Sequence, residues 1–413
     1  MPRPEMPRPA TGTAVAGMTM VTAGAMTANL ASYLLHLPAA QWLGPAGYGE
    51  FASLLAAQLV LAVPALALQT VVARETVRGA GTAALRRLGY RCAGLAGFVA
   101  LAVVPLVAWA LDTSVAGALG SLVTAPLLVL LATEQGLLQG RGRFGALSVV
   151  LAAAGVAKVV PAVAVLAVGG GPGAALFAGA VGTGFVAAAA ATLVSRSPAG
   201  PGSGTVPAVG VLAVLRASQV QLALIALTSL DLLLARTVLD PQDAGLYALG
   251  AVATKVAFWL PQAVGVVLYP RMADPAQSAA AVRSALTVLV GIGAALVAGA
   301  AVGAPLVPLL VGDAYAPVQS LLWLFALQGA CLAVLQGALL SAIAGERTHL
   351  AAVAWVGLAV EAALMLTVAT TTRQFVLVAV AVAATTAAVV SVLAVRAART
   401  VGPDTRPAPS GRM

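Results

Sequence analysis

The sequence predicts an all-α, polytopic membrane protein of about 12 transmembrane helices, arranged as two six-helix lobes related by pseudo-twofold symmetry. Hydrophobic residues make up 61% of the 413-residue chain and charged residues only 8%, with a mean hydropathy of +1.01. Soluble domains carry roughly a quarter of charged residues. Lipid is therefore the main solvent of this chain, and a soluble globular fold is excluded.

A long internal repeat predicts the two lobes. The segment 43–74 recurs about 200 residues later as 239–271, with one single-residue slip. Each copy contains a Leu-x-Pro turn, a Gly-x-aromatic-Ala sequence, a proline within the helix and a closing arginine. Internal repeats are a known construction of membrane transporters. The matched pairs are Gly49 with Gly245, Phe51 with Tyr247, Ala52 with Ala248, and Pro64 with Pro261.

Apolar stretches long enough to cross a bilayer follow one another along the chain. Hydrocarbon offers the backbone no water, so spans of about 20 residues are helices, whereas a β-barrel would show alternating segments of about ten residues. The 43 glycines and 24 prolines predict kinked, closely packed helices. The predicted spans are 11–37, 49–72, 89–111, 115–138, 145–168, 173–195, 209–238, 243–269, 280–310, 316–343, 348–370 and 374–397.

Polar breaks give the domain organisation. The first span is predicted to be a helix and not a signal peptide, because its apolar run of about 25 residues exceeds the 7–15 of a signal sequence. A stretch rich in Pro, Gly and Ser separates the sixth span from the seventh and is typical of a flexible linker. The predicted parts are a cytoplasmic N-terminus (1–10), an N-terminal lobe (11–195), a cytoplasmic linker (196–208), a C-terminal lobe (209–397) and a disordered cytoplasmic tail (398–413).

The arginines predict the orientation. If the N-terminus is cytoplasmic, nearly every inner break carries arginine, whereas the outer breaks hold only Arg236 and Arg373. Both termini are therefore expected in the cytoplasm. The formal charge of +9 is explained by anionic membrane lipids as partners, and no basic cluster with interleaved aromatic residues indicates a nucleic-acid partner.

Ionisable residues inside the spans are the candidate functional groups, because a charge at the bilayer centre costs about 2.5–3.5 kcal/mol. Lys158 and Glu361 lie near the middle of equivalent helices of the two halves, where a pseudo-twofold axis would let them face one cavity. Asp231 and Lys255 fall at comparable depth in a predicted helical hairpin, which favours a structural salt bridge. Asp231 is also a candidate for ion coupling and Lys255 for binding the substrate. Lys255 is replaced by the uncharged Gln58 in the first half, which suggests a task for one lobe only.

Other chemistry is not indicated. Cys92 and Cys331 have no C-x-x-C pattern, and His36 and His349 are isolated in the sequence, so neither a disulfide nor a metal site is expected. No acidic pair, histidine cluster or phosphate-binding glycine loop lies at either predicted surface. We therefore expect no cofactor and no enzyme activity.

Several motifs resemble a known family. The family's signature after its first helix is similar to Leu43, Gly44, Pro45, Gly47, Tyr48, Gly49 and Phe51. Later matches are Asp231, Gly245, Tyr247, Pro270 and Arg271, the turn 311–315 and the turn 345–347. Together they resemble the polysaccharide-transport branch of the multidrug/oligosaccharidyl-lipid/polysaccharide exporter superfamily.

The resemblance implies a flippase of the bacterial cytoplasmic membrane, in which two lobes enclose a central cavity open to one side at a time. Such proteins move polyprenyl-diphosphate-linked oligosaccharides outward for polysaccharide assembly, alongside a polymerase and glycosyltransferases. Lys158 would then attract the lipid diphosphate, and Glu361 would carry a coupling H⁺ or Na⁺; alternatively, the two form a structural ion pair. Arg74 and Arg271 are candidates for meeting phosphate at the cytoplasmic mouth, or ordinary inner arginines, and Asn29 is a candidate for lining the cavity.

Three other classes remain. A cation-coupled drug or small-molecule exporter of the same superfamily would share the fold. A major-facilitator transporter also has two six-helix halves, but the loop after the second span lacks the Gly-x-x-x-Asp-Arg-type motif expected there. A polytopic membrane enzyme lacks its catalytic groups.

Overall fold

The computed structural model describes residues 11–196, 210–259, 278–344 and 351–399, and all of its regular elements there are helices. The chain divides into two compact units, 1–221 and 222–413, which are described separately. Unit 1 contains α1 (Thr11–Leu61), α2 (Val63–Val77), α3 (Thr82–Ala110), α4 (Val115–Leu122), α5 (Thr124–Gly140), α6 (Phe144–Ala167), α7 (Pro172–Ser195) and α8 (Val211–Ala217). The helix α9 (Gln219–Leu227) crosses the division.

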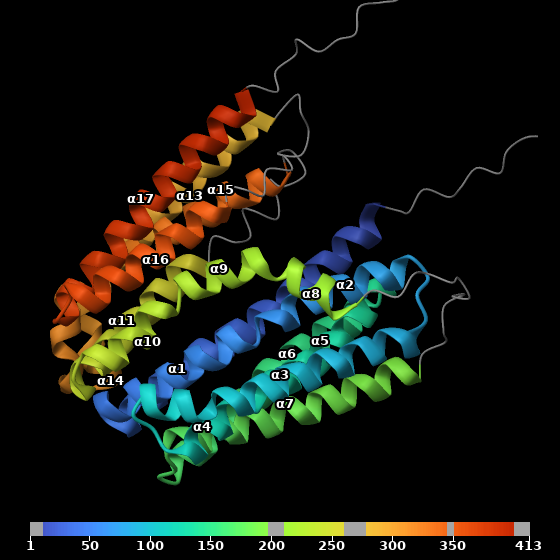
Figure 1. The fold of residues 1–413 in the computed structure, drawn as a ribbon, viewed down its shortest axis with the longest axis horizontal. Helices are drawn as coiled ribbons and strands as arrows, with labels where there is room; N and C mark the ends of the chain where they lie inside the picture. Colours follow the sequence, from blue (N-terminus) through green and yellow to red (C-terminus); the bar gives the residue numbers. More distant parts are fainter. Residues whose placement is uncertain (1–10, 197–209, 260–277, 345–350, 400–413) are drawn as a thin grey trace, which may run out of the picture. The chain divides into compact units, whose positions relative to one another are not determined.

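Unit 2 is also helical. It contains α10 (Leu230–Val238), α11 (Pro241–Trp259), α13 (Ser278–Gly303), α14 (Val307–Val311), α15 (Leu322–Ala344), α16 (Ala351–Thr367) and α17 (Thr372–Arg399), with 3₁₀ turns at Ala304–Leu306 and Asp313–Leu321. The helix α15 packs against α11, α13 and α17, while α10 packs against α11 and α16. Within each unit the long helices run side by side (Figure 1).

The prediction of an all-α polytopic membrane protein is confirmed. Nine helical segments of the described part are long and apolar enough to span a bilayer, and Ala352–Thr367 is a shorter apolar helix. Each of the twelve predicted spans overlaps a helix of the structure. The segment Thr19–Val77 covers most of the first predicted span and all of the second, and the span 243–269 lies partly outside the described residues.

A glycine separates the first two spans inside α1. At Gly44 the backbone is non-helical, with φ 64° and ψ 177°, and the chain turns back toward α2 (Figure 1). This combination of angles is essentially restricted to glycine. The turn lies in the Leu-Gly-Pro sequence that opens the first repeat.

Substitution of this glycine gives the first prediction. Gly44→Ala should destabilise unit 1 by about 1–3 kcal/mol, because a side chain at this φ and ψ is strained even where space is open. Melting of the purified protein, followed by fluorescence-detected gel filtration, measures the effect. Gly94→Ala is the matched control, since Gly94 is helical in α3 and a methyl group there would contact nothing within 4 Å. Equal melting temperatures of the two variants would contradict this account.

Small residues allow the helices of unit 1 to pack closely. A Cβ atom on Gly182 of α7 would lie 1.7 Å from the carbonyl oxygen of Ala157 in α6. A Cβ on Gly155 of α6 would lie 2.4 Å from the Cα of Ala28 in α1. Such contacts between small residues let helices associate in lipid, where the hydrophobic effect does not drive them together.

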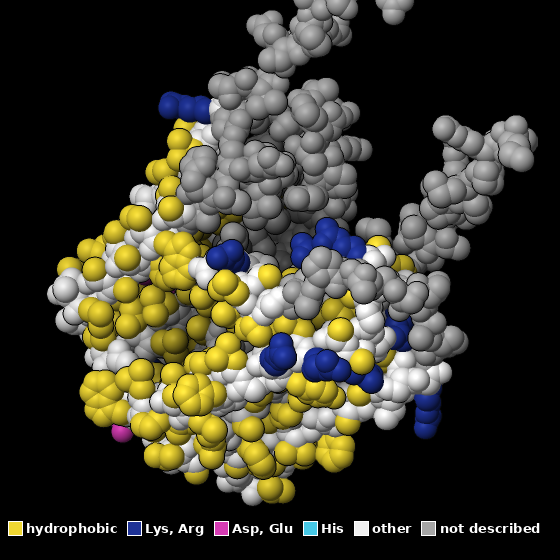
Figure 2. All heavy atoms as spheres, turned by 45° about the vertical axis from the view of Figure 1, so that its right-hand side comes forward, with side chains coloured by type: hydrophobic (Ala, Val, Ile, Leu, Met, Phe, Trp, Pro, Cys, Tyr) yellow, Lys and Arg dark blue, Asp and Glu magenta, His cyan; other side chains and the backbone are white. Residues whose placement is uncertain are grey.

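Large apolar side chains are exposed around the outside. Phe98, Trp109, Phe185 and Leu309 are between 69% and 81% exposed. Hydrophobic side chains cover much of the visible described surface, and the Lys and Arg side chains form separate groups (Figure 2). This surface suits lipid and not water, as expected of a multi-pass membrane protein.

Candidate functional site

A buried polar network surrounds Asp231 in unit 2. The Oδ2 atom of Asp231 accepts hydrogen bonds from the Tyr247 hydroxyl at 2.8 Å and from Gln328 Nε2 at 3.0 Å. Its Oδ1 atom accepts from the backbone N–H of Leu232 at 2.7 Å. Asp231, Tyr247 and Gln328 are each at most 1% exposed. Both oxygens of this buried carboxylate therefore have hydrogen-bond donors.

Thr254 extends the network to α15. Its hydroxyl lies 2.9 Å from the carbonyl oxygen of Phe325 and 3.1 Å from Oε1 of Gln328. The Gln328 amide therefore joins Asp231 of α10 to Thr254 of α11. The network fixes three helices relative to one another inside unit 2.

Aromatic rings enclose the Tyr247 side chain. The rings of Phe325 and Phe375 meet it edge to face, with centroids 5.0 Å and 5.9 Å away. Gly250 leaves the space that the Phe325 ring fills, since a Cβ there would lie 2.1 Å from that ring. Packing of this kind fixes the direction of the Tyr247 hydroxyl.

Two further ionisable groups adjoin Asp231. Lys255 of α11 is 8% exposed and interacts electrostatically with Asp231. Glu361 of α16 is 2% exposed, lies within electrostatic range of Asp231 and Tyr247, and has no hydrogen-bond partner for its Oε1 among the described residues. Two carboxyl groups and one ammonium group therefore share a buried part of unit 2.

The structure places the other predicted site residues as follows. Lys158 is half-buried in α6, where its backbone carbonyl and Cγ pack against Gly179 of α7. Asn29 is exposed on α1.

Two of the predicted site residues are arginines. Arg74, at the end of α2, shares the buried carboxylate of Glu75 with Arg78, at 3.1 Å and 3.0 Å. Arg271 lies outside the described residues. Lys158 and Glu361 belong to different units, so their facing across a cavity stays a prediction.

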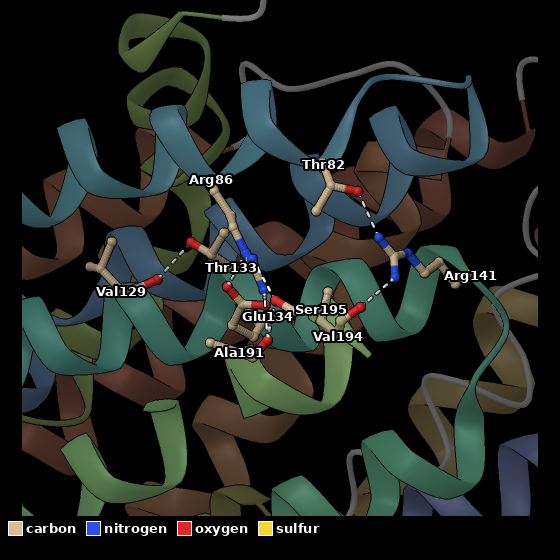
Figure 3. A network of polar contacts seen from close by, with 9 residues as sticks. All are labelled: Thr82, Arg86, Val129, Thr133, Glu134, Arg141, Ala191, Val194 and Ser195. Atoms are coloured by element: carbon tan, nitrogen blue, oxygen red, sulfur yellow. Dashed lines mark hydrogen bonds and ion pairs between the residues drawn. The ribbon is translucent and has the colours of Figure 1, made fainter. Parts of the chain in front are cut away.

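Arginines cap the end of α7 in unit 1. Arg86 of α3 forms a bidentate ion pair with Glu134 of α5, both contacts at 2.8 Å, and also donates to the Ala191 carbonyl and the Ser195 hydroxyl (Figure 3). Arg141 donates to the carbonyl of Val194 and to the Thr82 hydroxyl. The last carbonyls of a helix need such donors, so these arginines hold α3, α5 and α7 together.

The pKa of Arg141 reflects its crowded surroundings. Burial, followed by the nearby charges of Arg86 and Arg143, lowers the pKa of the Arg141 guanidinium. An arginine nevertheless stays protonated in proteins. The end of unit 1 at which α7 ends therefore carries a strong positive charge.

His36, which is isolated in the sequence, has a buried partner in the structure. It is 7% exposed, and its Nδ1 lies 2.8 Å from the Tyr48 hydroxyl. The pair resembles Asp231 with Tyr247, because each lies across the Leu-x-Pro turn of one repeat and joins the helix before the turn to the helix after it. Each half of the chain therefore buries a titratable side chain against a tyrosine hydroxyl.

Sequence reasoning missed Gln328 and Thr254. Their partners lie between 71 and 97 residues away in the chain, and no local motif contains them. A polar amide within a predicted span was the available signal. No group of three His, Cys, Asp or Glu that would suit a metal ion occurs among the residues that the structure describes.

Comparison with known proteins places the fold. No protein-family model and no curated protein matches the chain. Solved structures do match over nearly its whole length. An inward-facing multidrug resistance MATE family transporter of the MOP superfamily is 13% identical, with a TM-score of 0.70, covering 93% of this chain and 98% of that one. The chain has the fold of a MATE transporter.

Two further structures agree. An outward-facing multidrug resistance MATE family transporter is 16% identical, with a TM-score of 0.61 and 95% and 99% coverage. A MOP superfamily transporter from Pyrococcus furiosus, described as having a binding pocket of reverse polarity that suggests a different function, is 14% identical, with a TM-score of 0.55 and 96% and 99% coverage. These neighbours are transporters and not enzymes. The fold that the resemblance implied is therefore the fold of these structures.

Proposed function

We propose that this chain is an alternating-access transporter of a cell membrane, which exports small organic molecules in exchange for H⁺ or Na⁺. The fold supports transport, since the solved structures with this fold include multidrug resistance transporters in inward-facing and outward-facing states. The buried acidic network of unit 2 is the observation that carries the coupling step. The arginine distribution supports a cytoplasmic position for both termini.

Asp231 and Glu361 have different roles in this proposal. Asp231 is the fixed anion, because three donors and the nearby Lys255 stabilise its charge. Glu361 is the coupling group. Its buried Oε1 lacks a partner among the described residues and its neighbour Asp231 is negative, so an added proton or sodium ion removes an uncompensated charge. Binding and release of that cation would bias the two states of the transporter.

Glu361→Gln tests the coupling step. The amide mimics the protonated acid and cannot release a proton, so we expect proton-driven or sodium-driven export to fall about ten-fold or more, with normal protein in the membrane. Proteoliposomes with an imposed pH or sodium gradient and a fluorescent cationic drug provide the measurement. Asp313→Asn, a carboxyl-to-amide change at an exposed position, is the control. Gradient-driven transport by Glu361→Gln at the wild-type rate would remove Glu361 from the coupling step.

A second candidate function is supported by the sequence motifs around Leu43–Gly44–Pro45. They favour flipping of a polyprenyl-diphosphate-linked oligosaccharide to the outer leaflet of a bacterial cytoplasmic membrane, in association with a polymerase or glycosyltransferases. In that case Lys158, Lys255, Arg74, Arg271 and Asn29 would bind the substrate. A lysine ammonium replaces part of the hydration that a diphosphate loses on entering the membrane.

The two functions are separated by the Lys158 variants together with the substrate that the wild type moves. If the substrate is a lipid diphosphate, Lys158→Ala and Lys158→Gln should both reduce its translocation about ten-fold at equal protein abundance, because both remove the positive charge. Translocation of a lipid-linked oligosaccharide in proteoliposomes provides the measurement, beside drug export by the same preparation. Drug export without oligosaccharide translocation by the wild type would assign the chain to the small-molecule exporters.

A further inference from the structure

Unit 1 contains a cavity of about 610 Å³ that the transport proposal does not use. It lies at the starts of α4 and α7, beside Glu50 of α1. The helix α7 runs from this cavity to the arginines that cap its last turn, so the cavity is at the opposite end of α7 from the positive cluster. Its volume is typical of sites for small molecules, roughly 300–1,000 Å³.

Among the described residues that line the cavity, Glu50 alone carries a charged side chain. The Thr113 hydroxyl donates a hydrogen bond to Glu50 Oε1, which fixes that oxygen, while Ser114 is occupied in capping the Gly117 N–H at 2.9 Å. Gly117 and Gly173 let α4 and α7 approach closely beside the cavity, since a Cβ on Gly173 would lie 2.3 Å from the Cα of Gly117. A fixed carboxylate in a formed cavity is a ready partner for a cation.

The charge around the cavity favours a cation. The segments 37–50, 109–118 and 165–177, which form this end of unit 1, contain Glu50 and Asp112 but no lysine or arginine. The starts of α4 and α7 contribute partial positive charges of about one half each. Two full carboxylate charges exceed them, so the local potential is negative.

The walls of the cavity favour an organic cation with an apolar part. Phe177 and Leu119 line it and are 51% and 42% exposed. An exposed aromatic ring beside a carboxylate is a usual arrangement for binding substituted ammonium groups, which attract the face of the ring. The two exposed apolar side chains lie further along α7 and α4, toward the membrane interior, than the helix starts.

We infer that this cavity binds the ammonium head group of a membrane lipid, such as phosphatidylethanolamine. The ammonium pairs with Glu50 and contacts the ring of Phe177, and the apolar part follows Leu119 and Phe177 into the bilayer. This lipid site is independent of the transport proposal, and its test requires no transport.

Native mass spectrometry of the full chain tests the inference. The protein is released from nanodiscs that contain phosphatidylethanolamine and phosphatidylglycerol with identical acyl chains, and the retained lipids are counted. Glu50→Gln keeps an oxygen that can accept from Thr113 but removes the charge, so we expect the retained phosphatidylethanolamine to fall about ten-fold relative to phosphatidylglycerol. Phe177→Leu should lower it about two-fold or more. Asp313→Asn removes an exposed carboxylate of unit 2 and should leave the ratio at its wild-type value.

The outcomes are distinct. Equal lipid ratios for the wild type, Glu50→Gln and Phe177→Leu would overturn the site. If Glu50→Gln fails to fold, an unchanged ratio in Phe177→Leu alone would overturn it. A parallel arm adds soluble choline to delipidated protein in detergent. Choline binding that depends on Glu50 but is not displaced by phosphatidylethanolamine would overturn the lipid assignment and give the site to a free ammonium compound.

Discussion

Replacement of Asp231 by alanine is expected to destabilise unit 2 by about 3–5 kcal/mol, which is a large fraction of the stability of most domains. The change leaves the Tyr247 hydroxyl and the Gln328 amide without their acceptor, and it leaves the buried Lys255 without its nearby anion. Loss of the monodisperse peak in fluorescence-detected gel filtration, or a strongly lowered melting temperature, measures the effect.

A double variant separates the structural role of Asp231 from its role in transport. Asp231→Ala combined with Lys255→Met removes both buried charges, so it should recover much of the folded protein while transport stays low. If the double variant is as unstable as Asp231→Ala, the hydrogen bonds and not the charge pair account for the loss. A wild-type melting temperature for Asp231→Ala alone would refute the network as a source of stability.

Gly182→Ala is expected to separate α6 from α7. The added methyl group would lie 1.7 Å from the main-chain oxygen of Ala157, and main-chain atoms cannot move aside as a flexible side chain does. The two helices must therefore shift apart, at a cost at or above the upper end of the roughly 1–3 kcal/mol usual for overpacking. The melting temperature of the purified protein is the measurement.

Gly184 provides the matched control on the same helix. A Cβ there would lie 3.7 Å from the Leu127 side chain, which is an ordinary contact, so Gly184→Ala should melt within a few degrees of the wild type. The size of the difference between the two alanine variants reports the close approach of α6 and α7. Similar melting temperatures would mean that these helices are further apart than the structure has them.

The fold could be predicted from the sequence because lipid imposes strong constraints. Apolar runs gave the positions of the spans, and each overlaps a helix. The Leu-Gly-Pro sequence marked the end of the first span, where only glycine adopts the backbone angles found at Gly44. The close contact of Gly182 with Ala157 could not be predicted, because glycines are frequent in every span and the sequence does not say which of them face a neighbouring helix.

The candidate site was less accessible to sequence reasoning. Asp231 and Lys255 lie in consecutive helices, so their depth could be compared along a hairpin. Glu361 and Gln328 reach Asp231 only because α16 and α15 pack beside α10 and α11. The sequence matched Glu361 with Lys158 through the repeat, and this pairing between the units stays a prediction; within unit 2, Glu361 lies in electrostatic range of Asp231 and Tyr247. Packing between helices distant in the chain is not encoded in hydrophobic periodicity.

The two tyrosine contacts brace the turns of both repeats. Nδ1 of His36 lies 2.8 Å from the Tyr48 hydroxyl, and Asp231 accepts a hydrogen bond of 2.8 Å from the Tyr247 hydroxyl. In the repeat, however, Tyr247 matches Phe51 and not Tyr48. The two halves therefore share a polar brace across the hairpin but build it from side chains at different positions.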